Sequence, residues 1–539
     1  MKKIGLLICL FGSVLTNAQV TLTQSNLPII AISTNGAVIP DEPKINATMK
    51  VFWKGDGQNN AITDVAIYDG RIGIELRGST SKDLSDKKPF SIEIRDAAGA
   101  DIDTSLLGMP KESDWALVAP YSDKTLMRDA LMYQWGRSFM AWAPRTKFCE
   151  VIVNGSYQGV YALTEKIKRN KNRVNIAKTD ALAISGDALT GGYILKIDKT
   201  TGLITAGVPL GFTSKYVSGA SSKLPYLYHY PKAEDITTSQ KAYIQSLVNE
   251  FEDVMNSSNA KDPVNGYPKY LDVNSVVDFA LLNELSRNVD GYRLSSFLYK
   301  DKNSVSSKLK LGPIWDFNIG LGNADYCDGA KISGWAYDFN KTCPTDGLSI
   351  PFWWDKIVTD AEFKKKMRDR WQQLRRKELS NDKLLLPIDS MTNLLKDGQV
   401  RNFQKWKILG IYVWPNPVIK ATYAEEITYL RTWLKDRVAW LDGAIATFPT
   451  PTSETPIEQA QVSPNPSVSG FNFSYTLQNS SNVKLLIFNQ LGQNMYQKNV
   501  KQTSGENQLI WDGNAPSGIY FYEILFEDKL KMAGKLVKE

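Results

Sequence analysis

The chain has 539 residues, of which 43% are hydrophobic and 22% charged. That length exceeds one ordinary hydrophobic core, so we expect two or three globular domains. The net charge of +7 is mild and no basic run interleaves with aromatic residues, so no nucleic-acid partner is expected. The single histidine, His229, excludes His-based metal sites, and its aromatic neighbours favour packing over catalysis.

The first 18 residues are typical of a secretory signal peptide. Lys2 and Lys3 form the charged start, residues 4–15 form an apolar core, and Ala18 ends a small-residue cleavage site. No later apolar run approaches the length of a membrane span. We therefore expect an exported mature protein with no transmembrane segment.

Three cysteines remain in the mature chain. Cys149 lies in a run typical of a buried strand, where cysteine packs as a small hydrophobic residue. In an oxidising compartment Cys327 and Cys343 form either a disulfide or two free thiols, and the sequence favours neither. Without a CxxC pair or a Cys/His cluster, structural zinc is not expected.

Residues 19–447 mix strand and helix patterns, which predicts an α+β domain. Period-two alternation and apolar runs predict strands at 27–32, 49–53, 72–77 and 90–94, with a polar hairpin loop at 78–83. Asn154 and Gly155 predict a hairpin between strands at 148–153 and 159–163. Helical spacing predicts helices at 122–139, 237–255, 276–287, 360–379 and 424–446. Residues 170–240 show little periodicity, as an insertion would.

The C-terminal part is separated by a linker. Residues 448–460 are rich in Pro, Thr and Ser, and residues 461–539 alternate with period two between turn signals. This pattern predicts a small antiparallel β-sandwich.

The tail resembles the type IX secretion sorting domain of Bacteroidetes. The resemblance is carried by VSPNP (462–466), LIWDG (509–513), SGIYFY (517–522) and GKLVK (534–538). It implies the type IX secretion machinery as a partner, and a secreted or outer-membrane surface location. It implies nothing about activity.

Two acids flank a short predicted hairpin in the larger domain. Asp316 stands between Trp315 and Phe317 in the segment LGPIWDFN (311–318), and Asp290 precedes the first strand of the hairpin. An acid among aromatic residues is costly to bury without a partner, and a divalent metal is one such partner. Protein kinases place a catalytic Asp and a metal-binding Asp on either side of such a hairpin.

Upstream residues follow in the order of a kinase nucleotide site, although each alone also fits an ordinary turn or a solvated strand start. The loop after the strand at 72–77 is placed to cover phosphates, and Lys88 begins the next strand, with Lys166 and Lys196 as alternative phosphate-binding lysines. The predicted ATP-binding residues are Arg77, Gly78, Ser79, Lys88, Glu165, Lys166 and Lys196. The expected cofactors are ATP and either Mg²⁺ or Mn²⁺.

Residues 27–445 resemble the CotH kinase family. The resemblance is carried by LRGSTS (76–81), KKPF (87–90), DWAL (114–117), YSDKT (121–125), MRD (127–129), VNGSYQGVY (153–161), TEKI (164–167), GGYILK (191–196) and the two acidic segments. It implies an atypical protein-kinase-like fold that uses ATP and divalent metal to phosphorylate proteins. By resemblance, Asp290 matches the catalytic acid and Asp316 the metal-binding acid. Ser295 stands where kinases have a second metal-binding Asn, and Asn318 is an alternative source of that oxygen.

The sequence is compatible with three functions. The first is an exported kinase acting on a protein substrate. The second is a catalytically inactive, adhesin-like surface protein that keeps the fold, because little ATP is available outside the cell. The third is a glycan-active protein, in which Asp290 and Asp316 form a glycosidase pair if they lie about 5 to 10 Å apart.

Overall fold

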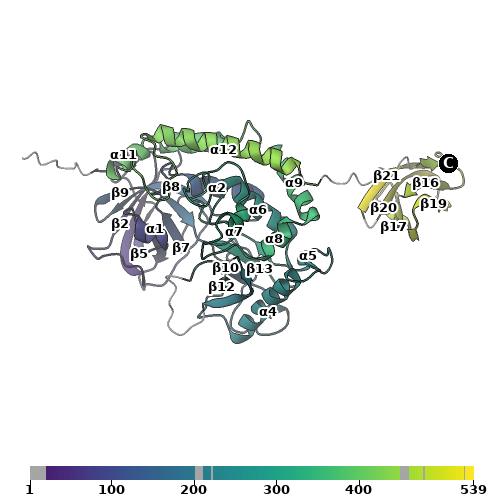
Figure 1. Cartoon of the computed structure of the whole chain (residues 1–539), viewed down its shortest axis with the longest axis horizontal. Coiled ribbons are helices and arrows are strands. Elements are labelled where there is room, and N and C mark those ends of the chain that lie inside the picture. Colours follow the sequence, from purple (N-terminus) through teal and green to yellow (C-terminus); the bar gives the residue numbers. More distant parts are fainter. Residues whose placement is uncertain (1–19, 201–209, 220–221, 450–460, 478–479, 527–528) are drawn as a thin grey trace, which may run out of the picture. The chain divides into compact units, whose positions relative to one another are not determined.

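The computed structural model describes residues 20–200, 210–219, 222–449, 461–477, 480–526 and 529–539. The chain forms two compact units, one ending at Phe448 and one beginning at Pro449 (Figure 1). The predicted signal peptide and most of the predicted linker lie outside the described residues.

The first unit begins with a closed barrel of seven strands. Their order is β2 (Ile29–Ser33), β3 (Ile45–Phe52), β5 (Tyr68–Leu76), β6 (Phe90–Arg95), β7 (Asp114–Val118), β9 (Ser156–Glu165) and β8 (Thr146–Val153). Only β2 and β8 pair in parallel. Alternate residues fill the barrel, among them Ile30, Met49, Ile72, Ile92 and Cys149. Beside it, β1 (Gln24–Ser25) pairs with β4 (Asn60–Ala61).

A second, antiparallel sheet carries the predicted hairpin. Its order is β11 (Gly211–Ser218), β12 (Ser222–Tyr230), β10 (Tyr193–Ile197), β13 (Ser296–Lys300) and β14 (Lys310–Leu311). β13 pairs with β14, as the sequence predicts. Residues 170–240 supply the other three strands, so this segment is an integral part of the sheet rather than an appendage.

Helices make up most of the rest of the first unit. They are α1 (Thr80–Leu84), α2 (Arg128–Phe139), α3 (Gly186–Leu189), α4 (Thr238–Met255), α5 (Tyr267–Tyr270), α6 (Val273–Ser286), η1 (Ala336–Asp338), α7 (Phe339–Thr342), α8 (Trp353–Val358), α9 (Ala361–Arg375), α10 (Leu386–Leu395), α11 (Gly398–Lys405) and α12 (Tyr423–Ala446). The long predicted helices are confirmed. Both α4 and α12 begin with a capping box, in which a Thr side chain and the third helical residue satisfy each other's backbone N–H groups. In Figure 1, α12 runs along one side of the unit from α11 to α9.

Two local predictions differ from the structure. The loop at 78–83 contains the one-turn helix α1 rather than a plain hairpin turn. Helix α2 begins at Arg128, later than predicted, because the Asp123 carboxylate accepts the backbone N–H groups of Thr125 and Arg128 and holds a loop before the helix.

Helix α6 lies at the centre of the unit. It is buried on nearly every face, from Val276 to Ser286, as expected for a helix that is apolar around most of its circumference. It contacts α2, α9, α12 and β14, and so connects the hairpin to the helical part. Within the described residues, no helix is both long and apolar enough to cross a membrane.

The second unit consists of two antiparallel sheets, as predicted. One contains β15 (Gln461–Ser463), β16 (Phe471–Leu477) and β19 (Gly505–Trp511). The other contains β18 (Asn494–Gln502), β17 (Ser481–Asn489), β20 (Gly518–Phe526) and β21 (Lys529–Lys538). Inward residues of both sheets, including Phe473, Leu485, Trp511 and Ile524, form its core.

Candidate active site

Asp290 lies in the turn that joins α6 to β13. Its Oδ1 accepts hydrogen bonds from Arg293 Nη2 at 2.8 Å and from the Tyr326 hydroxyl at 3.5 Å. The Arg293 side chain is only 3% exposed and also donates to Asp346 at 3.0 Å and to the Leu348 carbonyl at 2.8 Å. The orientation of Asp290 is therefore set by a buried guanidinium with several anchors.

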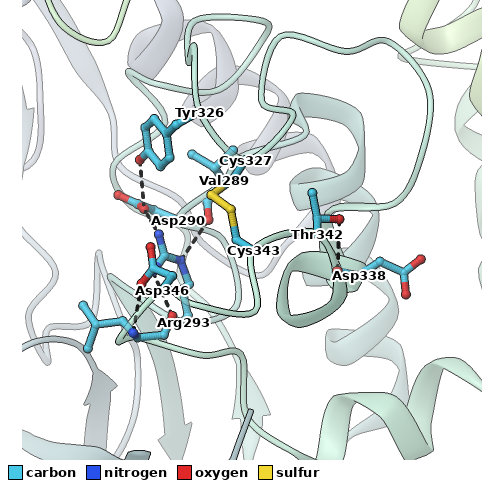
Figure 2. The surroundings of a disulfide bond; sticks show 10 residues. Val289, Asp290, Arg293, Tyr326, Cys327, Asp338, Thr342, Cys343 and Asp346 are labelled. Atoms are coloured by element: carbon cyan, nitrogen blue, oxygen red, sulfur yellow. Dashed lines mark hydrogen bonds and ion pairs between the residues drawn. A yellow bond between two sulfur atoms is a disulfide. The ribbon is translucent and has the colours of Figure 1, made fainter. Parts of the chain in front are cut away.

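A disulfide fixes the segments that supply these partners. Cys327 and Cys343 are bonded, which settles the alternative that the sequence left open. Figure 2 shows that the bond lies next to the cluster of Asp290, Arg293, Tyr326 and Asp346. Tyr326 directly precedes one cysteine and Asp346 follows the other by three residues, so the disulfide restricts both arms around Asp290.

Burial raises the pKa of Asp290, and the nearby carboxylates of Asp316 and Asp198 raise it further, against the opposing effect of Arg293. Lys199 also lowers it, so charges of both signs lie close to Asp290.

Asp316 follows β14 in a left-handed backbone conformation, with φ of 56°. Trp315 and Phe317 are buried on either side, while the Asp316 side chain is exposed. The cost of burying an acid among aromatic rings therefore does not arise for Asp316. Its neighbours point into the core, and the left-handed turn directs the carboxylate out of it.

Helix α2 holds the segment around Asp316 by its backbone. The Phe317 N–H donates to Asp129 Oδ1 at 2.6 Å, and the Asp316 N–H donates to the Tyr133 hydroxyl at 3.3 Å. The Trp315 ring stacks on Tyr133 with centroids 5.7 Å apart. Asp129 and Tyr133 are one helical turn apart, so a single face of α2 positions the acid.

Asp129 is a functional candidate that the sequence analysis did not select. Burial and the nearby Asp316 raise the pKa of its carboxyl to about 7. Its place in the MRD segment was recognised, but its approach to residue 317 depends on a contact between segments 188 residues apart.

Asp198 is a second acid that the sequence analysis missed. Pairing of Ile197 with Ser296 places the residue after β10 opposite Ser295. The Ser295 hydroxyl donates to Asp316 Oδ2 at 2.9 Å and lies 3.5 Å from Asp198 Oδ2. Ser295, at the position of the second metal-binding Asn in kinases, therefore bridges two carboxylates.

The predicted phosphate-binding lysines have different surroundings. Lys196 forms an ion pair with Asp198 and so lies at the acid cluster. Lys166 Nζ donates to Ser91 Oγ at 3.1 Å and lies 4.0 Å from Asp114, and burial lowers its pKa. Lys88 Nζ donates to the Lys82 carbonyl at 2.7 Å, within the α1 loop.

The remaining predicted nucleotide residues divide into two groups. The Arg77 guanidinium lies 5.4 Å from the centre of the Trp315 ring, next to the acid segment. Gly78 and Ser79 follow it and lead into α1, with Gly78 at φ of 87°. By contrast, the Glu165 carboxylate is fully buried and accepts two hydrogen bonds from Arg145.

The donor set around Asp316 fits a hard divalent cation. Its carboxylate is exposed, and Asn318 lies two residues further on and is partly exposed. Burial, with a smaller contribution from the charge of Asp316, raises the pKa values of the nearby carboxyls of Asp129 and Asp290. Among the described residues, no group of three or more His, Cys, Asp or Glu side chains is arranged to hold a metal ion. Mg²⁺ sites in proteins commonly use only one or two carboxylates, with phosphates and water supplying the other oxygens.

A hollow of about 450 Å³ lies elsewhere, between the end of α2, the start of α6 and β14. Its lining includes Trp142, Asp272 and Tyr299 and neither of the two central acids.

These features define an α+β protein with two acids on either side of a β-hairpin and an acidic site at one end of strands β10, β13 and β14. The chain belongs to the family described as CotH kinase protein, whose model matches residues 74–441. The second unit matches the secretion system C-terminal sorting domain over residues 461–539, and this domain indicates export by type IX secretion.

Other comparisons add little. No curated protein matches the chain. Among solved structures, an alkylpurine DNA glycosylase, AlkC of Pseudomonas fluorescens, bound to DNA containing an abasic site analogue, aligns at 13% identity with a TM-score of 0.14. The alignment covers 38% of this chain and 59% of that enzyme, which is less than two thirds of its length. A score so low carries no argument about fold or function.

Proposed function

We propose that this exported protein is an atypical kinase that transfers the γ-phosphate of ATP to hydroxyl groups of a protein substrate, with Mg²⁺ or Mn²⁺. The observation that carries the proposal is the position of Asp290 and Asp316 on either side of the β13–β14 hairpin, with Ser295 holding the Asp316 carboxylate next to Asp198. Protein kinases use this arrangement for their catalytic and metal-binding acids. The kinase-like fold of the first unit is part of the proposal.

Each residue has a distinct role. Asp290, oriented by Arg293, accepts or orients the proton of the acceptor hydroxyl. Asp316 and Asn318 provide the oxygens that hold the cation, and Ser295 positions the Asp316 carboxylate. A bound cation supplies neutralisation of the phosphate charge.

Basic groups on two sides of the acids complete the phosphate site. Lys196 lies beside Asp198 and Arg77 lies beside Trp315, whereas the Lys166 amino group donates to Ser91. In this arrangement Lys196 and Arg77 contact phosphate oxygens, and the backbone amides of Gly78 and Ser79 cover them. Nucleotide binding by Lys88 and Glu165 remains a prediction, although both side chains already have partners within the first unit.

Nucleotide binding by the mature chain tests the proposal. We expect ATP to bind in the presence of Mg²⁺ or Mn²⁺ and not in chelator, as measured by calorimetry. Asp316→Asn should abolish this binding while keeping the fold, because Asn tolerates the left-handed conformation at this position. Asp290→Asn is the matched control, which should keep ATP binding and lose phosphate transfer.

The alternative is a surface-binding protein without catalysis. The observation that favours it is that the described residues contain no preformed cluster of three metal-ligating acids. Absence of ATP binding with either metal would support this alternative and refute the kinase proposal.

A further inference from the structure

A loop close to Asp290 exposes several large apolar side chains. Between α11 and α12, Ile411 is 54% exposed, Tyr412 50%, Trp414 44% and Ile419 55%. Tyr412 and Trp414 are the only large aromatic side chains that are exposed among the described residues of the first unit. Apolar groups concentrated on one surface loop are typical of a contact site for another molecule.

Polar contacts hold this loop in place. The Tyr412 hydroxyl donates to Asp325 Oδ2 at 2.7 Å, and the Asp325 N–H donates to the Pro415 carbonyl at 2.9 Å. At the other end, Asn416 Nδ2 donates to Asn323 Oδ1 at 3.0 Å. The exposed rings are therefore already ordered, which lowers the entropic cost of binding a partner.

The loop is continuous with the candidate active site through one tyrosine. The Tyr326 ring stacks on Trp414, with centroids 5.8 Å apart and planes 12° from parallel. Its hydroxyl points at Asp290 Oδ1, 3.5 Å away, as Figure 2 shows. The disulfide at the next residue restrains Tyr326 further.

We propose that Tyr326, Ile411, Tyr412 and Trp414, here called the aromatic loop surface, dock an extended segment of the protein substrate. The segment presents a large apolar or aromatic side chain to this surface while its Ser or Thr hydroxyl reaches Asp290. The inference rests on the proposed function and specifies its substrate class.

The geometry limits where that side chain stands in the substrate. The Trp414 ring lies on the order of 10 Å from the Asp290 carboxylate, a span that about three or four extended residues cover. The apolar residue therefore lies within about four positions of the acceptor hydroxyl. A sugar ring would stack on the aromatic faces, but it would leave the exposed aliphatic side chains of Ile411 and Ile419 without a partner, so a peptide fits better.

Peptide binding without ATP tests the inference separately from catalysis. The labelled full-length chain is applied to an array of Ser-centred 11-residue peptides with one flanking position varied at a time, and the best peptide is titrated by fluorescence anisotropy. The same titration is run with Trp414→Ser. Val65→Ser is the control, because Val65 is an apolar residue of the first unit that is 93% exposed. Metal-dependent ATP binding is measured for all three proteins, and a glycan array is probed in parallel.

We expect the best peptides to carry Phe, Trp, Leu or Ile within four residues of the Ser. Trp414→Ser should weaken their binding about tenfold, with ATP binding unchanged, whereas Val65→Ser should change neither. No peptide binding, no preference for apolar residues, equal losses in both variants, or preferential glycan binding would each overturn the inference. If ATP binding is absent while the peptide preference holds, the proposed function fails and the docking surface stands.

Discussion

Replacing Arg437 with Met should destabilise the first unit by about 3 to 5 kcal/mol, because it leaves a buried charge without its partner. The side chains of Arg437 on α12 and Glu284 on α6 are both 0% exposed and lie 3.2 Å apart. Arg437 also donates to the carbonyls of Glu284, Ile332 and Gly334. Burial raises the pKa of Glu284 and lowers that of Arg437 to about 10, so desolvation outweighs their mutual attraction in both cases.

The other hydrogen-bond donors to Glu284 determine which second substitution should compensate for Arg437→Met. Its carboxylate accepts the N–H groups of Ala336 and Tyr337 and the Tyr292 hydroxyl at 2.8 Å. Glu284→Gln keeps an acceptor oxygen for these donors and removes the charge. In the Arg437→Met background this second change should restore at least about 1 kcal/mol, because an uncompensated buried carboxylate is no longer present.

Urea unfolding of the full chain, followed by near-ultraviolet circular dichroism, gives the free energies. In Arg437→Met the pKa of Glu284 rises further above its unfolded value. A raised acid pKa contributes stability at low pH that is lost as the pH rises, so the deficit of the variant should be larger at pH 7.5 than at pH 5. The reasoning is refuted if the single and double variants unfold with the same free energy, or if the deficit does not depend on pH.

Three further predictions use other parts of the first unit. His229 is the only histidine, and burial lowers its pKa to about 4, so its single NMR resonance should titrate near that value. The free energy of unfolding should increase as the pH rises from about 4 to 6.5, and this increase should be absent in His229→Gln. The double change Cys327→Ala and Cys343→Ala should lower the free energy of unfolding in urea by on the order of 3 kcal/mol. It should lower phosphate transfer more than ATP binding, because the segments around Asp290 are no longer joined. Equal losses of phosphate transfer and ATP binding would contradict this. Asp129→Ala should weaken Mn²⁺ binding measured by electron paramagnetic resonance, because the Phe317 N–H loses its acceptor, and Asp129→Asn should restore most of it if positioning is the role.

Local pattern was enough to predict much of this structure. Apolar spacing identified α4, α6, α9 and α12. Apolar runs, period-two alternation and the Asn154-Gly155 turn identified six of the seven barrel strands, all except β7, and alternation identified the C-terminal sandwich. The hairpin between Asp290 and Asp316 was also predicted, because short strands with flanking turns are encoded within a few residues.

Non-local contacts account for what the sequence did not reveal. Asp198 reaches the site only because β10 pairs with β13, about one hundred residues later in the chain. Asp129 reaches it only because one face of α2 packs against the segment after β14. The exposure of Asp316 follows from local alternation, which places its side chain opposite the buried rings of Trp315 and Phe317.

The backbone conformation around the acids argues for a working site over a retained scaffold. Among the described residues, eleven non-glycine residues have positive φ, and seven of them lie between positions 287 and 328. Such conformations cost of order 1 to 3 kcal/mol each and tend to persist where function requires them. Ser295 and Asp316 both belong to this group, and their side chains are hydrogen-bonded to each other. A protein that used this unit only as a surface scaffold would gain stability by relaxing these positions, so the concentration of positive φ between positions 287 and 328 supports the kinase proposal.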